Sequence, residues 1–482
     1  MKIAAIPYQL DSDIVYKDVG EHSSRPRLPA HSEVEPGFEK PDDIPLNKRN
    51  FAYTPCGPNP LFTELRYCTS EYPFEKVGIN YMDRSDGLAL QTGGSDVVGV
   101  PAAYGWRSGR CNACIKEGTV YWEVEVLRGG APDGADGIDK DELNTTPHVR
   151  VGVSRREASL EAPVGCDEYG YGVRDHTLES IHEGRVSQTL PAQRVRSGDR
   201  LGLLLQLPSA EAQRAQAAEY TEFKMDALLQ DGVGGGDDDT GAGAGEGPLR
   251  KRTRRLNREF QRALLREQDA ADVVRDHIAI RYRNQLFFEA TDYVKTTRPE
   301  YHTADRRERH DFYTLAGSYL RVYVNGEAAG DAFTELRPFL PPFSELKYND
   351  KFYFNYWRHG AGGGGAPVAA SSSAVPDDTA RLVSSPTAPS GATHTASPAT
   401  GAPGVLLRNK YVNNGRLGYY PTLSCFNGGA ARLIASPGDM RYWGRVRAEH
   451  AGARPLCEVF DEQVADDVVW DVVDEVDAED ER

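Results

Sequence analysis

Short runs of apolar residues, separated by Gly, Pro, Asn and Asp, dominate the chain from Asn50 to Ala435. Alternation of apolar and polar residues indicates a strand with one buried face, whereas a continuous apolar run is typical of a strand buried on both faces. TVYWEVEV and HVRVGVS alternate or nearly alternate, and RLGLLLQL is continuous. The strands predicted in this way are Thr119–Val126, His148–Ser154, Arg200–Leu207, His277–Tyr282, Gln285–Glu289, Tyr319–Val324, Lys351–Tyr356 and Tyr419–Phe426.

One turn is also visible in the pattern. Asn325 and Gly326 stand between VYV and EAAG, and both residue types tolerate a positive φ, so they predict a two-residue hairpin turn. Many short strands with few helical patterns predict an all-β chain that folds as an antiparallel β-sandwich. Two large loop insertions, 208–276 and 360–404, interrupt this predicted sandwich.

Composition divides the chain further. Residues 1–49 start with short apolar pieces and continue as a stretch rich in Pro and charge, which predicts an N-terminal extension and tether. We expect the sandwich over 50–435, a linker over 436–457 and a helix over 458–482. The second insertion, 360–404, consists mainly of Gly, Ala, Ser, Pro and Thr, so we expect it to be disordered.

The last residues form an amphipathic helical pattern. The apolar half of the helical wheel holds Val464, Ala465, Val468, Val469, Val472, Val473 and Val476. The other half, which we expect to face solvent, holds Asp466, Asp467, Asp471, Asp474 and Asp477. Valines have a low helix propensity, so this helix needs a surface on which to fold. That surface is either a groove on another subunit, the reading we favour, or the protein's own sandwich.

Charge is distributed unevenly along the 482 residues, whose formal net charge is −16. The segment from Glu458 to Arg482 contains twelve acidic residues and one Arg, so the rest of the chain is close to neutral. The opposite extreme is a basic cluster in the first insertion, made of Arg250, Lys251, Arg252, Arg254 and Arg255. It is consistent with a nuclear import signal, a patch for nucleosomal DNA, or a solvated loop.

The sequence also excludes some classes of protein. No window approaches about 18 uninterrupted apolar residues, so we expect no membrane-spanning segment. The apolar stretch at the start is too short for a secretory signal. Seven cysteines at irregular spacing do not form a disulfide framework, which indicates a reducing compartment.

Catalytic motifs are missing from the sequence. It contains no GxGxxG that opens a helix, no P-loop, no GxSxG and no HExxH, so we expect neither an enzyme nor a bound cofactor. Cys111 and Cys114 form a CxxC pair, but no second pair follows at a useful spacing. We therefore expect no metal site and interpret both cysteines as small apolar residues in a sheet.

The best candidate for a binding site extends from Arg150 to Arg174. These two arginines flank a loop with Pro and Gly that also holds Tyr169 and Tyr171. Guanidinium groups beside aromatic rings on a rigid sheet edge suit a short acidic or aromatic peptide. The alternative is that both arginines are solvated or paired within the chain.

A family resemblance begins at this stretch. EGTVYWEVEV, HVRVGVSRREASLEAPVGCDEYGYGVRD, SGDRLGLLL and VYVNGEAAGDAF together resemble a SPRY domain. The extended form, with NQLFFEATDYVKTT and RNKYVNNGRLGYYPT, resembles the SPRY subunit of COMPASS-type histone methyltransferase complexes, the family of yeast Bre-two and animal Ash-two-like subunits. The resemblance covers nearly the whole chain outside the two insertions.

The resemblance implies a non-catalytic nuclear scaffold that supports methylation of lysine 4 of histone H3. The implied pocket residues are Trp106, Arg150, Pro163 and Arg174, which would bind an acidic-aromatic segment of the β-propeller subunit of the retinoblastoma-binding-protein or Swd type. This pair would support the SET-domain catalytic subunit. The C-terminal helix would bind the dimeric Dpy-thirty/Sdc-type subunit, and other COMPASS subunits and the nucleosome are further expected partners.

Two alternative functions would require features that the sequence lacks. SPRY domains also serve as peptide-binding adaptors of ubiquitin ligases, which would require a RING or a SOCS box, and the sequence contains neither. A methyltransferase acting alone would require a cofactor pocket with Gly-rich text, which is also missing. We therefore favour the scaffold function.

Overall fold

The computed structural model describes residues 29–42, 51–59, 65, 67–130, 145–220, 278–282, 285–291, 313–340 and 415–480. Three predictions lie outside the described residues. They concern the strand Lys351–Tyr356, the insertion 360–404 and the basic cluster at Arg250–Arg255.

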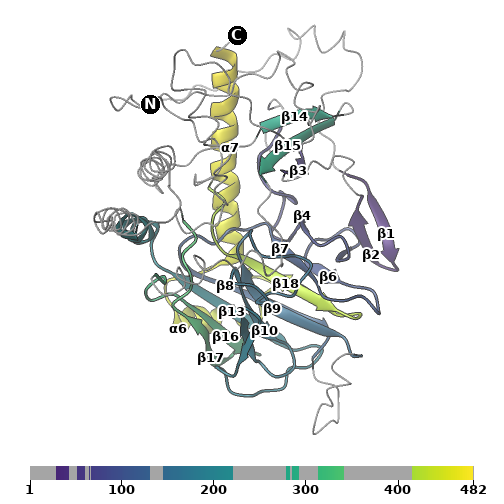
Figure 1. Ribbon diagram of the computed structural model, residues 1–482, viewed down its shortest axis with the longest axis vertical. Helices are drawn as coiled ribbons and strands as arrows, with labels where there is room; N and C mark the ends of the chain where they lie inside the picture. The colour runs from purple at the N-terminus through teal and green to yellow at the C-terminus, as the bar shows by residue number, and fades with distance from the viewer. Residues whose placement is uncertain are drawn as a thin grey trace, which may run out of the picture.

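Two sheets form a sandwich, the lower body of the molecule in Figure 1. The larger sheet has the order β1-β2-β5-β6-β19-β8-β13-β16-β17, and β20 also pairs with β8. Its strands are β1 (His31–Glu35), β2 (Phe38–Pro41), β5 (Ala89–Gln91), β6 (Val97–Gly99), β8 (Gly118–Arg128), β13 (Arg200–Leu207), β16 (Tyr319–Val324), β17 (Glu327–Thr334), β19 (Ala430–Ile434) and β20 (Ala453–Pro455).

The second sheet of the sandwich has the order β12-β11-β10-β9-β18-β7-β4. Its strands are β4 (Ile79–Arg84), β7 (Arg107–Cys111), β9 (His148–Ser154), β10 (Gly170–Arg174), β11 (Ser180–His182), β12 (Arg185–Ser187) and β18 (Tyr420–Phe426). A small third sheet has the order β14-β15-β3. It consists of β3 (Phe51–Pro55), β14 (Ile278–Tyr282) and β15 (Gln285–Thr291).

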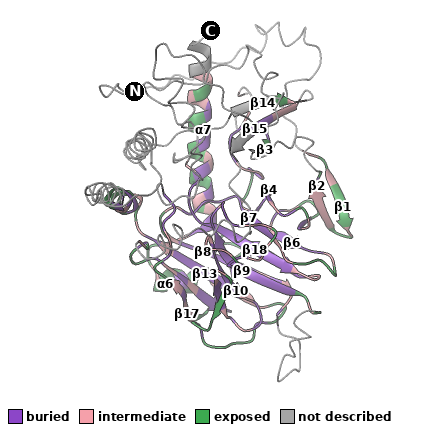
Figure 2. Ribbon diagram, in the orientation of Figure 1, coloured by how far each residue is buried: buried purple, intermediate pink, exposed green. Residues whose placement is uncertain are grey.

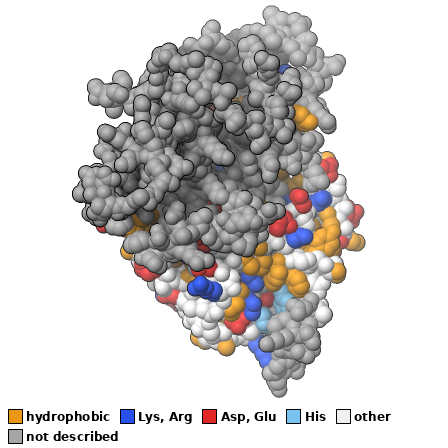
Figure 3. Space-filling view, in the orientation of Figure 1, with side chains coloured by type: hydrophobic (Ala, Val, Ile, Leu, Met, Phe, Trp, Pro, Cys, Tyr) orange, Lys and Arg blue, Asp and Glu red, His pale blue; other side chains and the backbone are white. Residues whose placement is uncertain are grey.

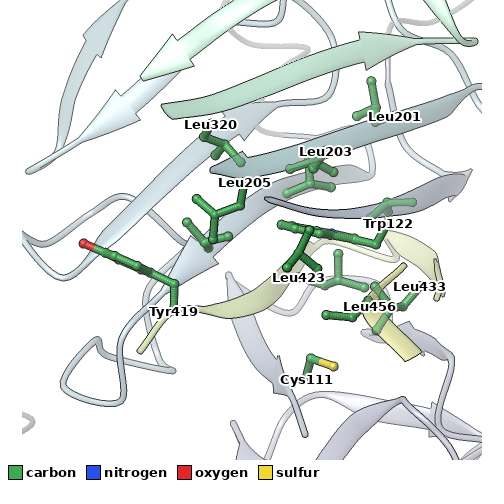
Figure 4. Packing of buried hydrophobic residues seen from close by; sticks show 14 of the residues in the cluster. Cys111, Trp122, Leu201, Leu203, Leu205, Leu320, Tyr419, Leu423, Leu433 and Leu456 are labelled. Carbon is green, nitrogen blue, oxygen red and sulfur yellow. The ribbon is translucent and has the colours of Figure 1, made fainter. Parts of the chain in front are cut away.

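The core lies between the two large sheets. Trp122 of β8 is fully buried and packs near Leu203 of β13 and Leu423 of β18 (Figure 4). These strands carry apolar residues at every second position, and successive side chains of a strand point to opposite faces. The apolar pattern of the sequence therefore encodes the face that each strand buries.

The outer face of β8 is covered as well. Tyr121 stacks on Trp443 of the helix α6 (Trp443–Glu449), with ring centroids 6.1 Å apart. Glu123 is buried and accepts hydrogen bonds from the backbone amides of Arg441 and Tyr442 at 3.0 and 2.8 Å. The helix and its preceding turn thus bury a carboxylate that the alternating pattern alone would place in solvent.

The predicted fold class is confirmed, because the chain is mainly antiparallel β-sheet with few helices and a C-terminal helix. The runs at Thr119–Val126, His148–Ser154 and Arg200–Leu207 fall within β8, β9 and β13. The hairpin is also present. Asn325 and Gly326 connect β16 to β17 and have φ values of 49° and 83°, the positive angles that this turn requires.

Two segments differ from their prediction. The expected linker, 436–457, instead contains α6 and β20, and β20 pairs in parallel with β8. Residues 31–41 of the expected tether form β1 and β2, which extend one edge of the larger sheet. Both segments contain short strands rich in charge or proline, such as HSEVE and ARP, and these carry little of the alternation on which the prediction relied.

The helix α7 (Leu456–Asp480) begins directly after β20 and runs away from the sandwich (Figure 1). A further helical stretch covers 210–220 in the first insertion, and the rest of that insertion up to 277 lies outside the described residues. Within the described part of the chain, no helix is both long and apolar enough to cross a membrane.

Candidate functional site

Arg150 lies in the middle of β9 with unusual surroundings for a cation. Only 6% of the residue is exposed, and its guanidinium carbon lies 4.9 Å from the ring centroid of Trp106. Its Nη1 donates to the carbonyl of Val164 at 3.3 Å. Among the described residues, its Nε has no hydrogen-bond partner and the side chain forms no ion pair with a carboxylate. Burial lowers the pKa of Arg150; Cys166 and Asp175 oppose this shift, and the nearby Arg174 adds to it.

The loop above Arg150 is fixed by two serines. Ser424 of β18 accepts a hydrogen bond from the Val164 amide at 2.9 Å and lies 2.7 Å from Ser108 of β7. The Ser108 hydroxyl also donates to the carbonyl of Ala162 at 2.7 Å. These bonds hold Pro163, which lies between Ala162 and Val164, above the second sheet. The sheet thereby sets the position of this loop beside Arg150.

Gly172 of β10 lets the loop approach this closely. A Cβ at this position would lie 2.3 Å from the carbonyl oxygen of Val164 and 3.1 Å from Cδ of Arg150. Any side chain here would displace either the loop or the arginine. The second glycine of YGYGVR is therefore required because a larger residue would not fit.

Arg174 pairs directly with Arg150 across β9 and β10, so the two predicted arginines are neighbours on the sheet. Arg174 differs in its surroundings, because its Nη1 lies 2.8 Å from Glu179 Oε2 and its side chain is partly exposed. Cys166, which is exposed, hydrogen-bonds through its amide to the Pro163 carbonyl at 3.1 Å. Within the described part of the chain, Arg174 is paired with a carboxylate and Arg150 is not.

A column of aromatic rings lies beside Arg150. Trp106, which directly precedes β7, stacks on Phe426 with ring centroids 5.3 Å apart. Phe426 in turn stacks on His148 at 6.4 Å. The sequence indicated Trp106 only through the family resemblance, and it did not indicate Phe426 or His148. These two residues stand at opposite ends of their strands, and only the pairing of β18 with β9 brings them together.

The base of α7 docks on the protein's own body. Leu456 and Phe460 reach into the main core. Asp467 accepts from Arg416 Nη2 at 2.6 Å and from the Ser70 hydroxyl at 3.0 Å. One turn later, Asp471 accepts from the amide and hydroxyl of Thr69 at 3.1 and 2.6 Å. Both aspartates are buried, which corrects the prediction that this half of the wheel faces solvent.

The valine half of α7 points largely away from this contact. Val469 is 57% exposed, its neighbour Trp470 is 39% exposed, and Ala465 is exposed as well. Val464, Val472, Val473 and Val476 are intermediate, and Val468 is buried at the border of the docked face. Figure 2 shows the resulting mixture of buried and exposed residues along the helix. Trp470 was missed by the sequence analysis because it falls outside the valine arc.

The chain is also similar in sequence to known proteins. The chain is 45% identical over 517 aligned residues to the COMPASS component BRE2 of Saccharomyces cerevisiae, and the match covers 99% of each chain. It is 26% identical to the Set1 complex component ash2 of Schizosaccharomyces pombe, over 94% of this chain and 50% of that protein. No family model matches the chain.

The chain belongs to the BRE2 family.

Among solved structures, this BRE2-family protein is similar to a human SPRY domain with 9% identity and a TM-score of 0.24, over 71% of this chain and 92% of that one. A second similar structure is the SPRY domain of human HERC1, with 16% identity and a TM-score of 0.19, over 27% of this chain and 69% of that one.

The CxxC of this BRE2-family protein is built into the sandwich. Cys111 and Cys114 are both buried, and burial raises the pKa of the Cys111 thiol to about 12. The pKa of Cys114 is raised for the same reason. A thiol with a raised pKa is a poor nucleophile and a poor metal ligand at neutral pH, because both roles require the thiolate.

Proposed function

We propose that this protein is a non-catalytic scaffold subunit of a COMPASS-type complex in the nucleus, and that it stimulates methylation of lysine 4 of histone H3 by a SET-domain subunit. Membership of the BRE2 family supports the role in the complex, since relatives carry the names of COMPASS and Set1 complex components. The observation that carries the proposal is Arg150, a buried guanidinium that lies over an indole ring without a carboxylate partner in the described chain.

Arg150 suits an acidic-aromatic peptide for two reasons. A carboxylate from a partner would supply the charge that the buried guanidinium lacks, and such desolvated charge pairs strongly affect affinity. The column of Trp106 and Phe426 offers a flat apolar wall for an aromatic side chain. We assign the peptide to the β-propeller subunit of the retinoblastoma-binding-protein or Swd type, with Pro163 and Arg174 at the edge of the same pocket.

The exposed half of α7 supports a second contact, with the dimeric Dpy-thirty/Sdc-type subunit. The base of the helix is fixed by Asp467 and Asp471, so the valine half is presented in a defined direction. An apolar helix face that is already ordered loses less entropy when a groove covers it. For the basic cluster at Arg250–Arg255 we retain two roles, contact with nucleosomal DNA and nuclear import.

A reconstituted methylation assay tests the proposed function. The SET-domain and β-propeller subunits are assayed on histone H3 with and without this protein. We expect the wild-type chain to raise the rate of lysine 4 methylation, and Arg150→Ala to lose most of that stimulation. Arg185→Ala, which removes an exposed arginine of β12, is the matched control. Methylation by this chain alone, or equal stimulation by Arg150→Ala, would refute the proposal.

A further inference from the structure

Three side chains that the proposed pocket does not use meet at one end of β9 and β10. His148 is the first residue of β9, and Asp175 and His176 directly follow β10. Because the two strands are antiparallel and pair Arg150 with Arg174, these ends lie at the same edge of the sheet. All three residues are buried, and potential ligand atoms of all three lie within 4.8 Å of one another.

The two imidazoles direct polar atoms at the carboxylate without forming hydrogen bonds to it. His148 Nδ1 lies 3.4 Å and His176 Nδ1 lies 3.7 Å from Asp175 Oδ1. Both Nδ1 atoms are buried and have no hydrogen-bond partner among the described residues. Buried polar atoms are normally satisfied, so two orphaned nitrogens around one oxygen need an explanation.

The carboxylate is held so that one oxygen remains for this cluster. Asp175 Oδ2 accepts hydrogen bonds from the amides of Gly130 and Val149 at 2.6 and 2.7 Å. Asp175 Oδ1 is therefore left to face the two imidazoles.

The spacing fits a metal ion. Zinc binds imidazole nitrogen and carboxylate oxygen at about 2.0–2.2 Å, which places neighbouring ligand atoms of a tetrahedral site about 3.3–3.5 Å apart. The two histidine–carboxylate separations of 3.4 and 3.7 Å are close to this value, and ligand atoms of all three residues lie within 4.8 Å of one another. We propose that His148 Nδ1, His176 Nδ1 and Asp175 Oδ1 bind one Zn²⁺ ion, with a fourth position left for water or a partner's side chain.

The surroundings of His148 support the assignment. Its Nε2 lies 3.0 Å from the hydroxyl of Thr146, so a histidine that presents the Nδ1 lone pair to zinc can donate its Nε2–H to that oxygen. Such an outer contact fixes the tautomer and the orientation of a ligating ring. The sequence analysis considered only the CxxC pair as a metal site. It missed this cluster because His148 is far in the chain from the adjacent pair Asp175 and His176, and the three match no common ligand spacing.

Titration of the chelator-treated full chain with Zn²⁺ and with Co²⁺ tests the site. We expect one ion per chain, and a Co²⁺ absorption spectrum typical of four-coordinate nitrogen and oxygen ligands. Loss of an outer contact alone weakens metal binding by about 10–100-fold. His176→Ala removes a ligand and should weaken Zn²⁺ binding by at least this factor. His31→Gln is the matched control, because His31 lies 2.8 Å from Glu39 in a two-residue pair without a third ligand.

The site is overturned if the wild-type chain takes up no Zn²⁺, or if His176→Ala binds it as tightly as wild type while its circular dichroism is unchanged. Should His176→Ala fail to fold, Thr146→Val serves in its place. It leaves all three ligands intact and should weaken Zn²⁺ binding by about 10–100-fold. Unchanged affinity in that variant, together with an octahedral Co²⁺ spectrum in the wild type, would likewise contradict the assignment.

Discussion

Two arginines of this protein are buried to nearly the same degree in opposite electrostatic surroundings. Arg416 is 7% exposed and places its Nη2 2.6 Å from Asp467 of α7. Arg150 is 6% exposed, lies over Trp106 and has no carboxylate partner in the described chain. Burial opposes the charge of both, but Asp467 and Glu71 raise the pKa of Arg416 above its ordinary value, whereas the pKa of Arg150 is lowered.

The difference separates a structural charge from a binding charge. A buried cation loses hydration, and only a partner with good geometry compensates for that loss. Arg416 has its partner inside the chain and ties the middle of α7 to the body of the protein. Among the described residues Arg150 has no carboxylate partner, so an anionic group from another molecule would improve its environment. Figure 3 shows basic and histidine side chains among hydrophobic ones on the face where the second sheet lies.

Removing the partner of Arg416 should have the largest effect. Asp467→Ala removes the carboxylate 2.6 Å from the buried Arg416 and leaves it only the more distant Glu71 at 3.9 Å, so it should lower the free energy of unfolding by about 3–5 kcal/mol. Denaturant unfolding measures this change. Asp466→Ala, on an exposed neighbour, is the control and should stay within about 0.5 kcal/mol of wild type. An equal effect of both variants would remove the distinction between the two arginines.

A second variant separates the two faces of α7. Val469→Glu puts a charge on the exposed apolar half, so it should weaken binding of the Dpy-thirty/Sdc-type dimer by more than about 2 kcal/mol. Stability of the isolated chain should hardly change, since Val469 is 57% exposed. Binding measured by calorimetry decides the matter, with Asp474→Ala as a control expected to bind like wild type. Retained binding by Val469→Glu would show that the helix uses another face.

Only a small change in stability is expected at Arg150. Arg150→Met keeps much of the side-chain volume and removes a charge that has no partner, so unfolding should change by less than about 1 kcal/mol or the variant should be more stable. Thermal unfolding of the isolated chain measures this. A loss as large as that of Asp467→Ala would mean that Arg150 supports the fold.

The local residue pattern predicted individual strands and one turn. The alternation in β8 and β9 and the Asn325-Gly326 turn followed from side-chain periodicity and φ preference. The sequence placed Arg150 and Arg174 on either side of one loop, and the pairing of β9 with β10 makes them neighbours.

The contacts of α7 could not be predicted in this way. A helical wheel shows which residues share a face but not what that face meets, and Asp467 and Asp471 meet partners 51 and 402 residues away. The strand β20 is similar, since three residues with Pro carry no periodicity and gain their structure from pairing with β8. The cluster of His148, Asp175 and His176 depends likewise on strand pairing, and no spacing in the sequence reveals it.

The central claim is tested most directly by binding calorimetry. The acidic-aromatic segment of the β-propeller subunit is titrated into the wild-type, Arg150→Met and Arg185→Ala chains. The account predicts that Arg150→Met weakens binding by about 2–4 kcal/mol, because the peptide carboxylate loses its buried partner, whereas Arg185→Ala binds like wild type. Wild-type affinity in a folded Arg150→Met chain would show that the unpaired guanidinium is not the binding charge.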